Sequence, residues 1–167
     1  MGCALVEITS LEHAAPHEVE ALLDAAFGVD RRTRAVYRVR AGLAWLPDLS
    51  FAAMHGADLV ASLQSWPVRL AGDGASVTPL VLVGPVAVAP AMQGRGLGTA
   101  LMRALIAAAK AADTPPLMMV GDPEYYARFG FSAGATRGWR LPGSFEARRL
   151  LARDAPDGRS GMLVGGW

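Results

Sequence analysis

The chain has 167 residues, of which 52% are hydrophobic, and a formal net charge of +1. Its length fits one domain with a sizeable core, so we expect a single domain over residues 1–167. The near-neutral charge argues against nucleic acid or an anionic membrane surface as a partner, and no stretch of about 18 residues is apolar enough for a membrane span.

Cysteine and histidine usage also limits the chemistry. Cys3 is the only cysteine, which excludes an internal disulfide and a multi-cysteine zinc site. The three histidines show no metal-binding spacing, so we expect no metal. The opening MGCALVEITS lacks a basic start and a long apolar core, and Val6 breaks the myristoylation pattern. We therefore expect a cytoplasmic protein.

The first third of the chain predicts a strand and a helix. Residues 3–8 alternate weakly, as a strand does, whereas Pro16 suits a first helical turn and Gly28 suits a stop. The apolar face of this helix would consist of Val19, Leu22, Leu23, Ala26 and Phe27. A second helix or turn is expected in the arginine-rich segment that ends at Gly42.

Three strand-like segments follow. Residues 49–54 and 58–70 are joined by a short polar turn and predict a hairpin. After a turn at 71–76, residues 77–90 form a long apolar strand interrupted by Gly84-Pro85. Proline cannot donate to a strand ladder, so we expect a bulge or a splay at this point.

The rest of the chain alternates helices and strands. Leu97, Leu101, Leu105 and Ala108, with Met102 and Ile106 beside them, predict one buried face of a helix that runs to about Ala112. We then expect a strand at 116–121, a short helix at 122–131 closed by Gly130, a loop at 133–144, and strands at 145–152 and 161–167. This order predicts a mixed α/β architecture.

Glycines alternate where the long strand meets the helix, at Gly94, Gly96 and Gly98. Glycine lets the backbone turn so that N–H groups at a helix start converge on an anion such as a phosphate. The spacing matches neither a Walker loop, which needs a lysine, nor a dinucleotide fingerprint, which needs glycine where Thr99 stands. The alternative is a tight turn that binds nothing.

Two segments carry a resemblance to a known family. The stretch VAVAPAMQGRGLGTALM resembles motif A of the GNAT superfamily of acetyl-CoA-dependent N-acetyltransferases. The segment from Tyr125 to Phe131, YYARFGF, resembles a second family segment, and the order of elements matches over most of the chain. The resemblance implies a mixed, mainly antiparallel sheet, splayed at the fourth strand and flanked by helices.

It also implies acetyl-CoA as co-substrate. Backbone groups of Val86, Ala87 and Val88 are expected to pair with the pantetheine arm. The loop that is expected to hold the pyrophosphate consists of Gln93, Gly94, Arg95, Gly96, Leu97, Gly98 and Thr99. The acceptor would be a primary amine of a small molecule or peptide, acetylated by direct attack in a ternary complex by a monomer or homodimer.

Tyr126 aligns with the family tyrosine that can protonate the CoA sulfur. A phenol is a weaker acid than a thiol by about 1.5 units, roughly 2 kcal/mol, so hydrogen-bond stabilisation of the leaving thiolate is the expected role. The strand at 80–88 offers no general base, and Asp122, Glu146 and His55 are the remaining candidates. The alternative function is a non-catalytic acyl-CoA-binding module.

The arginine-rich segment allows two interpretations. A cluster of cations bordering the acceptor site would suit a carboxylated acceptor, whereas a solvated helix face needs no ligand. The residues concerned are Arg31, Arg32, Arg34, Arg38 and Arg40.

Overall fold

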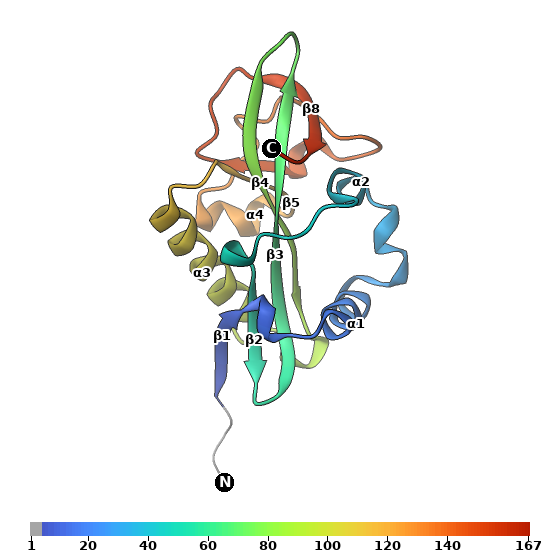
Figure 1. Ribbon diagram of the computed structural model, residues 1–167, viewed down its shortest axis with the longest axis vertical. Coiled ribbons are helices and arrows are strands. Elements are labelled where there is room, and N and C mark those ends of the chain that lie inside the picture. Colours follow the sequence, from blue (N-terminus) through green and yellow to red (C-terminus); the bar gives the residue numbers. More distant parts are fainter. Residues whose placement is uncertain (1–4) are drawn as a thin grey trace. The chain divides into compact units, whose positions relative to one another are not determined.

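A computed structural model describes residues 5–167, and Figure 1 shows its elements. Cys3 and Ala4, the first two residues of the strand expected at 3–8, lie outside this described part. The chain divides into two compact units. Unit 1 contains Met1–Arg31, Trp45–Ser65 and Pro85–Asp113, and unit 2 contains Arg32–Ala44, Trp66–Gly84 and Thr114–Trp167. Each unit therefore combines three separate stretches of sequence.

The strands are mainly antiparallel and the helices lie between them in sequence. The elements of the first half are β1 (Val6–Ser10), α1 (Pro16–Phe27), α2 (Ala35–Arg40), β2 (Phe51–His55), β3 (Asp58–Gly72) and β4 (Val77–Val88). Those of the second half are α3 (Leu97–Ala112), β5 (Leu117–Val120), α4 (Pro123–Tyr126), β6 (Gly138–Arg140), β7 (Leu150–Arg153) and β8 (Ser160–Gly165).

The strands follow the order β1-β2-β3-β4-β5-β7, and β8 pairs with both β3 and β6. The pairs β1–β2, β2–β3, β5–β7 and β3–β8 are antiparallel, whereas β4–β5 and β6–β8 are parallel. The expected mixed α/β fold with a mainly antiparallel sheet is confirmed. Within residues 5–167, no helix has the length and apolarity needed to cross a membrane.

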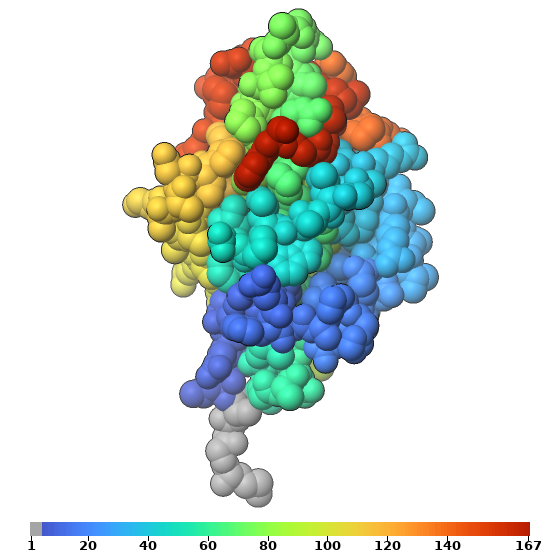
Figure 2. Space-filling model, in the orientation of Figure 1, coloured from blue at the N-terminus to red at the C-terminus, as the bar shows by residue number. Residues whose placement is uncertain are grey.

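Helix α1 forms where the sequence predicts it. Pro16 occupies the first helical position, and Gly28 ends the helix with φ of 87°, a conformation that glycine adopts readily. Val19, Leu22 and Leu23 are buried in the core of unit 1, with Ala26 and Phe27 partly buried against them. The opposite side of α1 lies at the surface, where the helix is blue in Figure 2.

The hairpin between β2 and β3 also matches the prediction. His55 lies opposite Asp58 at its closed end, and Gly56 between them has φ of 61°. On its other edge, β2 pairs with β1 along its whole length, from Ser10 opposite Phe51 to Val6 opposite His55. Strand β1 therefore extends two residues beyond the predicted segment.

Strand β6 is absent from the sequence-based expectation, which assigned residues 133–144 to a loop. Its three residues pair in parallel with β8, and Gly138 lies opposite Ser160. A Cβ atom on Gly138 would lie 2.7 Å from Cβ of Ser160, so the close approach of these strands depends on glycine. Strand β7 begins at Leu150, after a 3₁₀ turn at Ala147–Arg149, and is shorter than predicted.

The expected splay of β4 is confirmed at Gly84. Its pairing with β5 in unit 2 comprises Val81–Leu117 and Leu82–Met118, although β5 continues to Val120. Gly84 has φ of 128°, and its carbonyl accepts a hydrogen bond from the indole N–H of Trp66 at 2.7 Å. A side chain thus binds a carbonyl at the point where β4 separates from its neighbour.

Candidate functional site

A glycine-containing turn connects β4 to α3. The N–H of Ala89, just after β4, donates a hydrogen bond to the carbonyl oxygen of Val60 at 2.8 Å. A 3₁₀ turn at Pro90–Met92 then leads into the loop. Gly94 and Gly96 have φ of 77° and 76°. An L-residue with a side chain adopts this left-handed conformation at a cost of about 1–2 kcal/mol, so both positions favour glycine for the backbone alone.

Gly94 and Gly96 face open space. A Cβ atom built on Gly94 or Gly96 would meet no atom within 4 Å. Among the described residues, the backbone N–H groups of residues 94–98 donate to no protein acceptor. Because α3 begins at Leu97, its N-terminal partial charge of about +0.5 adds to these donors. The turn therefore has the donors and the space to bind an anion.

Helix α3 holds this glycine turn in place. Leu101, Met102 and Leu105 are completely buried, and the helix packs against β1 and β2 of unit 1. Ala109 is buried in the last turns, whereas the predicted Ala108 is only partly so. A well-packed helix keeps its first N–H groups in a fixed direction, which lowers the entropy lost when a ligand binds.

Strand β4 ends at Val88, shortly before this loop begins in the sequence. Ala87 is buried in the core of unit 1, while Val86 and Val88 are half-buried. Arg95 is exposed and, within the described part of the chain, forms no ion pair. All ten residues predicted to bind the co-substrate thus belong to unit 1, and they are Val86 to Val88 and Gln93 to Thr99.

Tyr126 lies in unit 2, at the end of α4. Asp122 caps this short helix by accepting a hydrogen bond from the N–H of Glu124 at 3.1 Å. The Tyr126 ring packs edge-on against Tyr125, with centroids 4.9 Å apart, and against Phe131 at 6.3 Å. Within residues 5–167 its hydroxyl has no hydrogen-bond partner, so the O–H group remains available to a ligand.

The surroundings of Tyr126 keep its hydroxyl protonated. Burial, with smaller contributions from Tyr125 and the Asp122 carboxylate, raises the pKa of Tyr126 to about 12. The difference from a thiol near 8.5 is then about three to four units, or roughly 5 kcal/mol. Complete proton transfer to a thiolate is more unfavourable than the sequence suggests, and hydrogen-bond donation is favoured more strongly.

This pKa predicts a measurable pH dependence. A phenol whose pKa is higher in the folded state than its unfolded value near 10 stabilises the fold fully below about pH 10. That contribution is lost as the pH rises through about 12. In an absorbance titration of tyrosinate formation, the tyrosine that ionises at the highest pH should be missing in Tyr126→Phe. Circular dichroism over the same pH range should show that both proteins stay folded. Identical titration curves for the two proteins would contradict this assignment.

Gly121 makes room for the Tyr126 ring, a role that the sequence does not reveal. A Cβ atom on Gly121 would lie 2.6 Å from Cε2 of Tyr126 and 2.8 Å from Cδ2. Gly121→Ala should therefore displace the ring and destabilise the protein by about 1–3 kcal/mol. If Tyr126 stabilises the leaving thiolate, as the sequence predicts, this variant should also lower kcat without weakening acetyl-CoA binding. Chemical denaturation and steady-state kinetics measure the two effects.

Gly134→Ala is the matched control for Gly121→Ala. Its added Cβ would lie 3.5 Å from Oγ of Ser132, which is an ordinary van der Waals contact. This variant should retain both wild-type stability and wild-type kcat. Equal behaviour of the two alanine variants would show that Gly121 does not set the position of the tyrosine.

The three residues predicted as candidate general bases cap a helix, lie at a hairpin end or lie at the surface. Asp122 caps α4, and hydrogen bonding with Glu124 lowers its pKa, which makes the carboxylate a weaker base. His55 lies at the end of the β2–β3 hairpin, and Glu146 is exposed. Among residues 5–167 there is no cluster of three His, Cys, Asp or Glu side chains able to hold a metal ion.

Two of the five arginines in the N-terminal segment are buried, which neither sequence interpretation anticipated. Arg31 is 1% exposed and forms ion pairs with Glu20 and Asp24. Arg40 is stacked on the rings of Tyr37, at 3.9 Å, and Trp66, at 4.5 Å. Paired acids and aromatic faces compensate the burial of these two charges, so neither belongs to a solvated face.

Comparison with known proteins identifies the family. A model described as an acetyltransferase (GNAT) domain matches residues 7–134. Among proteins with curated functions, none matches the sequence.

Solved structures share the fold at low sequence identity. The GNAT family N-acetyltransferase YhbS from Escherichia coli, solved with CoA, has 23% identity and a TM-score of 0.70, with 97% of this chain and 89% of that chain covered. A GNAT family acetyltransferase from Brucella melitensis, solved with acetyl-CoA, has 23% identity and a TM-score of 0.65, with 96% of each chain covered. Since the family model spans more than half of the chain, this protein belongs to the GNAT family of acetyltransferases.

Proposed function

We propose that the chain is an acetyl-CoA-dependent N-acetyltransferase acting on a primary amine of a small molecule or peptide. The observation that carries this proposal is the open glycine turn, in which the N–H groups of residues 94–98 lack protein acceptors. Family membership and two similar structures solved with CoA or acetyl-CoA support the choice of ligand. Residues 1–167 act as one domain, as a cytoplasmic monomer or homodimer.

In this proposal the co-substrate binds along the end of β4 and the following loop. Backbone groups of Val86, Ala87 and Val88 pair with the amides of the pantetheine arm. The loop from Gln93 to Thr99 holds the pyrophosphate through its N–H groups, and Arg95 adds a positive charge. These contacts recognise the diphosphate only. Selectivity for the acyl group must come from other residues.

The reaction is a direct attack of the amine nitrogen on the thioester carbonyl carbon. A C–N bond forms, the C–S bond breaks, and the sulfur leaves with the electron pair. Tyr126 donates its O–H to the developing thiolate, while the amine proton passes to water. No metal is required. A donor with a pKa near 12 remains protonated throughout, which suits stabilisation by hydrogen bonding.

A non-catalytic acyl-CoA-binding module is the second candidate. The observation in its favour is the lack of a general base. Residues 80–88 have no side chain able to accept a proton, and Asp122 caps a helix. The Tyr126 hydroxyl, which has no protein partner among residues 5–167, favours the enzyme because it can donate to a leaving thiolate.

One assay separates the two candidates. Calorimetry with acetyl-CoA should show binding in either case. When a panel of primary amines is added, an enzyme should release free CoA thiol in proportion to acetylated amine, whereas a binding module should release none above the rate of spontaneous hydrolysis. Failure to bind acetyl-CoA would contradict both.

A further inference from the structure

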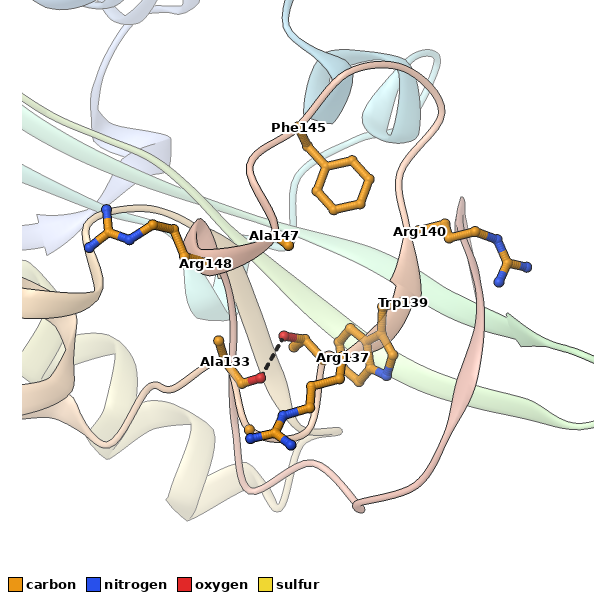
Figure 3. A pocket seen from close by; sticks show the side chains of 9 residues that line it. Ala133, Arg137, Trp139, Arg140, Phe145, Ala147 and Arg148 are labelled. Atoms are coloured by element: carbon orange, nitrogen blue, oxygen red, sulfur yellow. Dashed lines mark hydrogen bonds between the residues drawn. The ribbon is translucent and has the colours of Figure 1, made fainter.

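Unit 2 contains an open pocket of about 620 Å³ that lies outside the predicted co-substrate loop (Figure 3). This volume is within the range of small-molecule sites, which is about 300–1,000 Å³. Its walls come from the turn after α4, from β6 and from the segment before β7. None of the residues assigned to acetyl-CoA or to thiolate stabilisation lines it.

Two aromatic side chains form the apolar part of this pocket. Trp139 is 2% exposed and Phe145 is half-buried. Figure 3 shows Phe145 on one side of the hollow and Trp139 on the other, with Ala147 between them on the third side. The accessible Phe145 ring can cover one face of a flat apolar group, for which the gain comes from area removed from water and from ring contacts.

The charged part of the pocket is entirely positive, because three arginines and no acidic residue line it. Two of these arginines are already neutralised. Arg140 pairs with Asp73 at 2.9 Å and Arg148 pairs with Glu124, and in Figure 3 both guanidinium groups point away from the hollow. They therefore contribute little to binding inside it.

Arg137 differs from the other two arginines. In the described part of the chain its side chain forms no ion pair or hydrogen bond, so no partner holds it in place. Figure 3 shows it beside the Trp139 ring with its guanidinium directed away from Phe145, and a rotation of this long side chain would bring the guanidinium toward the pocket. The indole N–H of Trp139 is likewise buried without an acceptor among residues 5–167. An unsatisfied buried donor costs about 1–3 kcal/mol, which a ligand oxygen would recover if a small rotation of the ring exposed the N–H group.

We infer that this pocket binds a small carboxylate with a flat apolar body, such as an aromatic acid. The carboxylate pairs with the Arg137 guanidinium, whose planar fork matches its two oxygens. The body packs against the half-buried ring of Phe145, while Trp139 supports the pocket wall from the covered side. Charge alone would attract any anion, and apolar walls alone would attract any hydrophobe, so the combination selects molecules with both properties.

Phenylacetate is a suitable probe, with phenylacetamide as its neutral isostere and inorganic phosphate as an anion without an apolar body. Calorimetry should give a dissociation constant for phenylacetate in about the millimolar range or tighter. Phenylacetamide and phosphate should each bind at least about tenfold more weakly. Equal binding of the amide, equal binding of phosphate, or no saturable binding of phenylacetate would overturn the inference.

Variants test the assigned residues. Arg137→Gln and Phe145→Ala should each weaken phenylacetate binding about tenfold or more. Arg103→Gln is the matched control, because Arg103 is exposed, has no ion pair among the described residues and lies on α3. Unchanged affinity in either pocket variant would contradict the assignment. The Gly96→Pro variant should lose acetyl-CoA affinity but keep wild-type phenylacetate affinity. The two measurements on this variant therefore test the acetyl-CoA proposal and the pocket inference separately.

Discussion

Replacing Tyr126 with phenylalanine should lower kcat by about ten- to a thousandfold while the dissociation constant for acetyl-CoA changes little. The substitution keeps the ring and its contacts with Tyr125 and Phe131 but removes the hydroxyl. If that hydroxyl stabilises the thiolate, the loss belongs to the transition state and appears in kcat. Steady-state kinetics on an amine found by screening, with calorimetry for binding, separate the two parameters.

Tyr125→Phe is the matched control for this experiment, since it removes a hydroxyl from the adjacent tyrosine. The Tyr125 ring stacks with Arg128 at 4.4 Å, a contact that phenylalanine preserves. The control should keep near wild-type kcat. The effect of Tyr126→Phe should also shrink with acyl donors whose thiols are more acidic, because their thiolates need less stabilisation. Wild-type rates in folded Tyr126→Phe would reduce the residue to a packing role.

Gly96→Pro should raise the dissociation constant of acetyl-CoA by about tenfold to a hundredfold or more. Proline removes one N–H donor, and a hydrogen bond to a charged group contributes about 1.5–3 kcal/mol. Proline also fixes φ near −65°, whereas Gly96 has φ of 76°, so the turn must change its shape. Because α3 is held by its buried face, the fold should survive. Calorimetry of a variant with wild-type circular dichroism checks the prediction.

Gly42→Pro is the control for placing proline at a position where the backbone has a positive φ. Gly42 has the same φ of 76°, and a Cβ atom there would also meet nothing within 4 Å. Both variants should lose stability for the same conformational reason, but only Gly96→Pro changes the turn proposed to bind the pyrophosphate. A similar loss of acetyl-CoA affinity in Gly42→Pro, or none in folded Gly96→Pro, would contradict the assigned binding mode.

Local signals predicted the parts of the fold that local chemistry determines. Pro16 and Gly28 bound a helix because proline suits a first turn and glycine adopts the positive φ of its end. The alternating glycines predicted the turn before α3 for the same reason, since two of them have positive φ. At Gly84-Pro85, the missing donor predicted the splay of β4, and the structure places an unusual φ of 128° there.

Long-range contacts account for what the sequence did not reveal. Strand β6 is three residues long, too short for alternation to be visible, and exists because Gly138 lets it approach β8. Arg31 and Arg40 were expected on a surface or near an acceptor, but acids and aromatic rings from other parts of the chain bury them. Gly121 was missed because its purpose depends on where the Tyr126 ring lies.

The most direct test of the proposed function is to incubate the purified chain with acetyl-CoA and a panel of primary amines. Free thiol and acetylated product should be measured together by absorbance and mass spectrometry. The proposal predicts equal amounts of the two for at least one amine, with the rate strongly reduced in both Tyr126→Phe and Gly96→Pro. Binding of acetyl-CoA without any acetylated amine, across small-molecule and peptide acceptors, would contradict catalysis and favour the binding module.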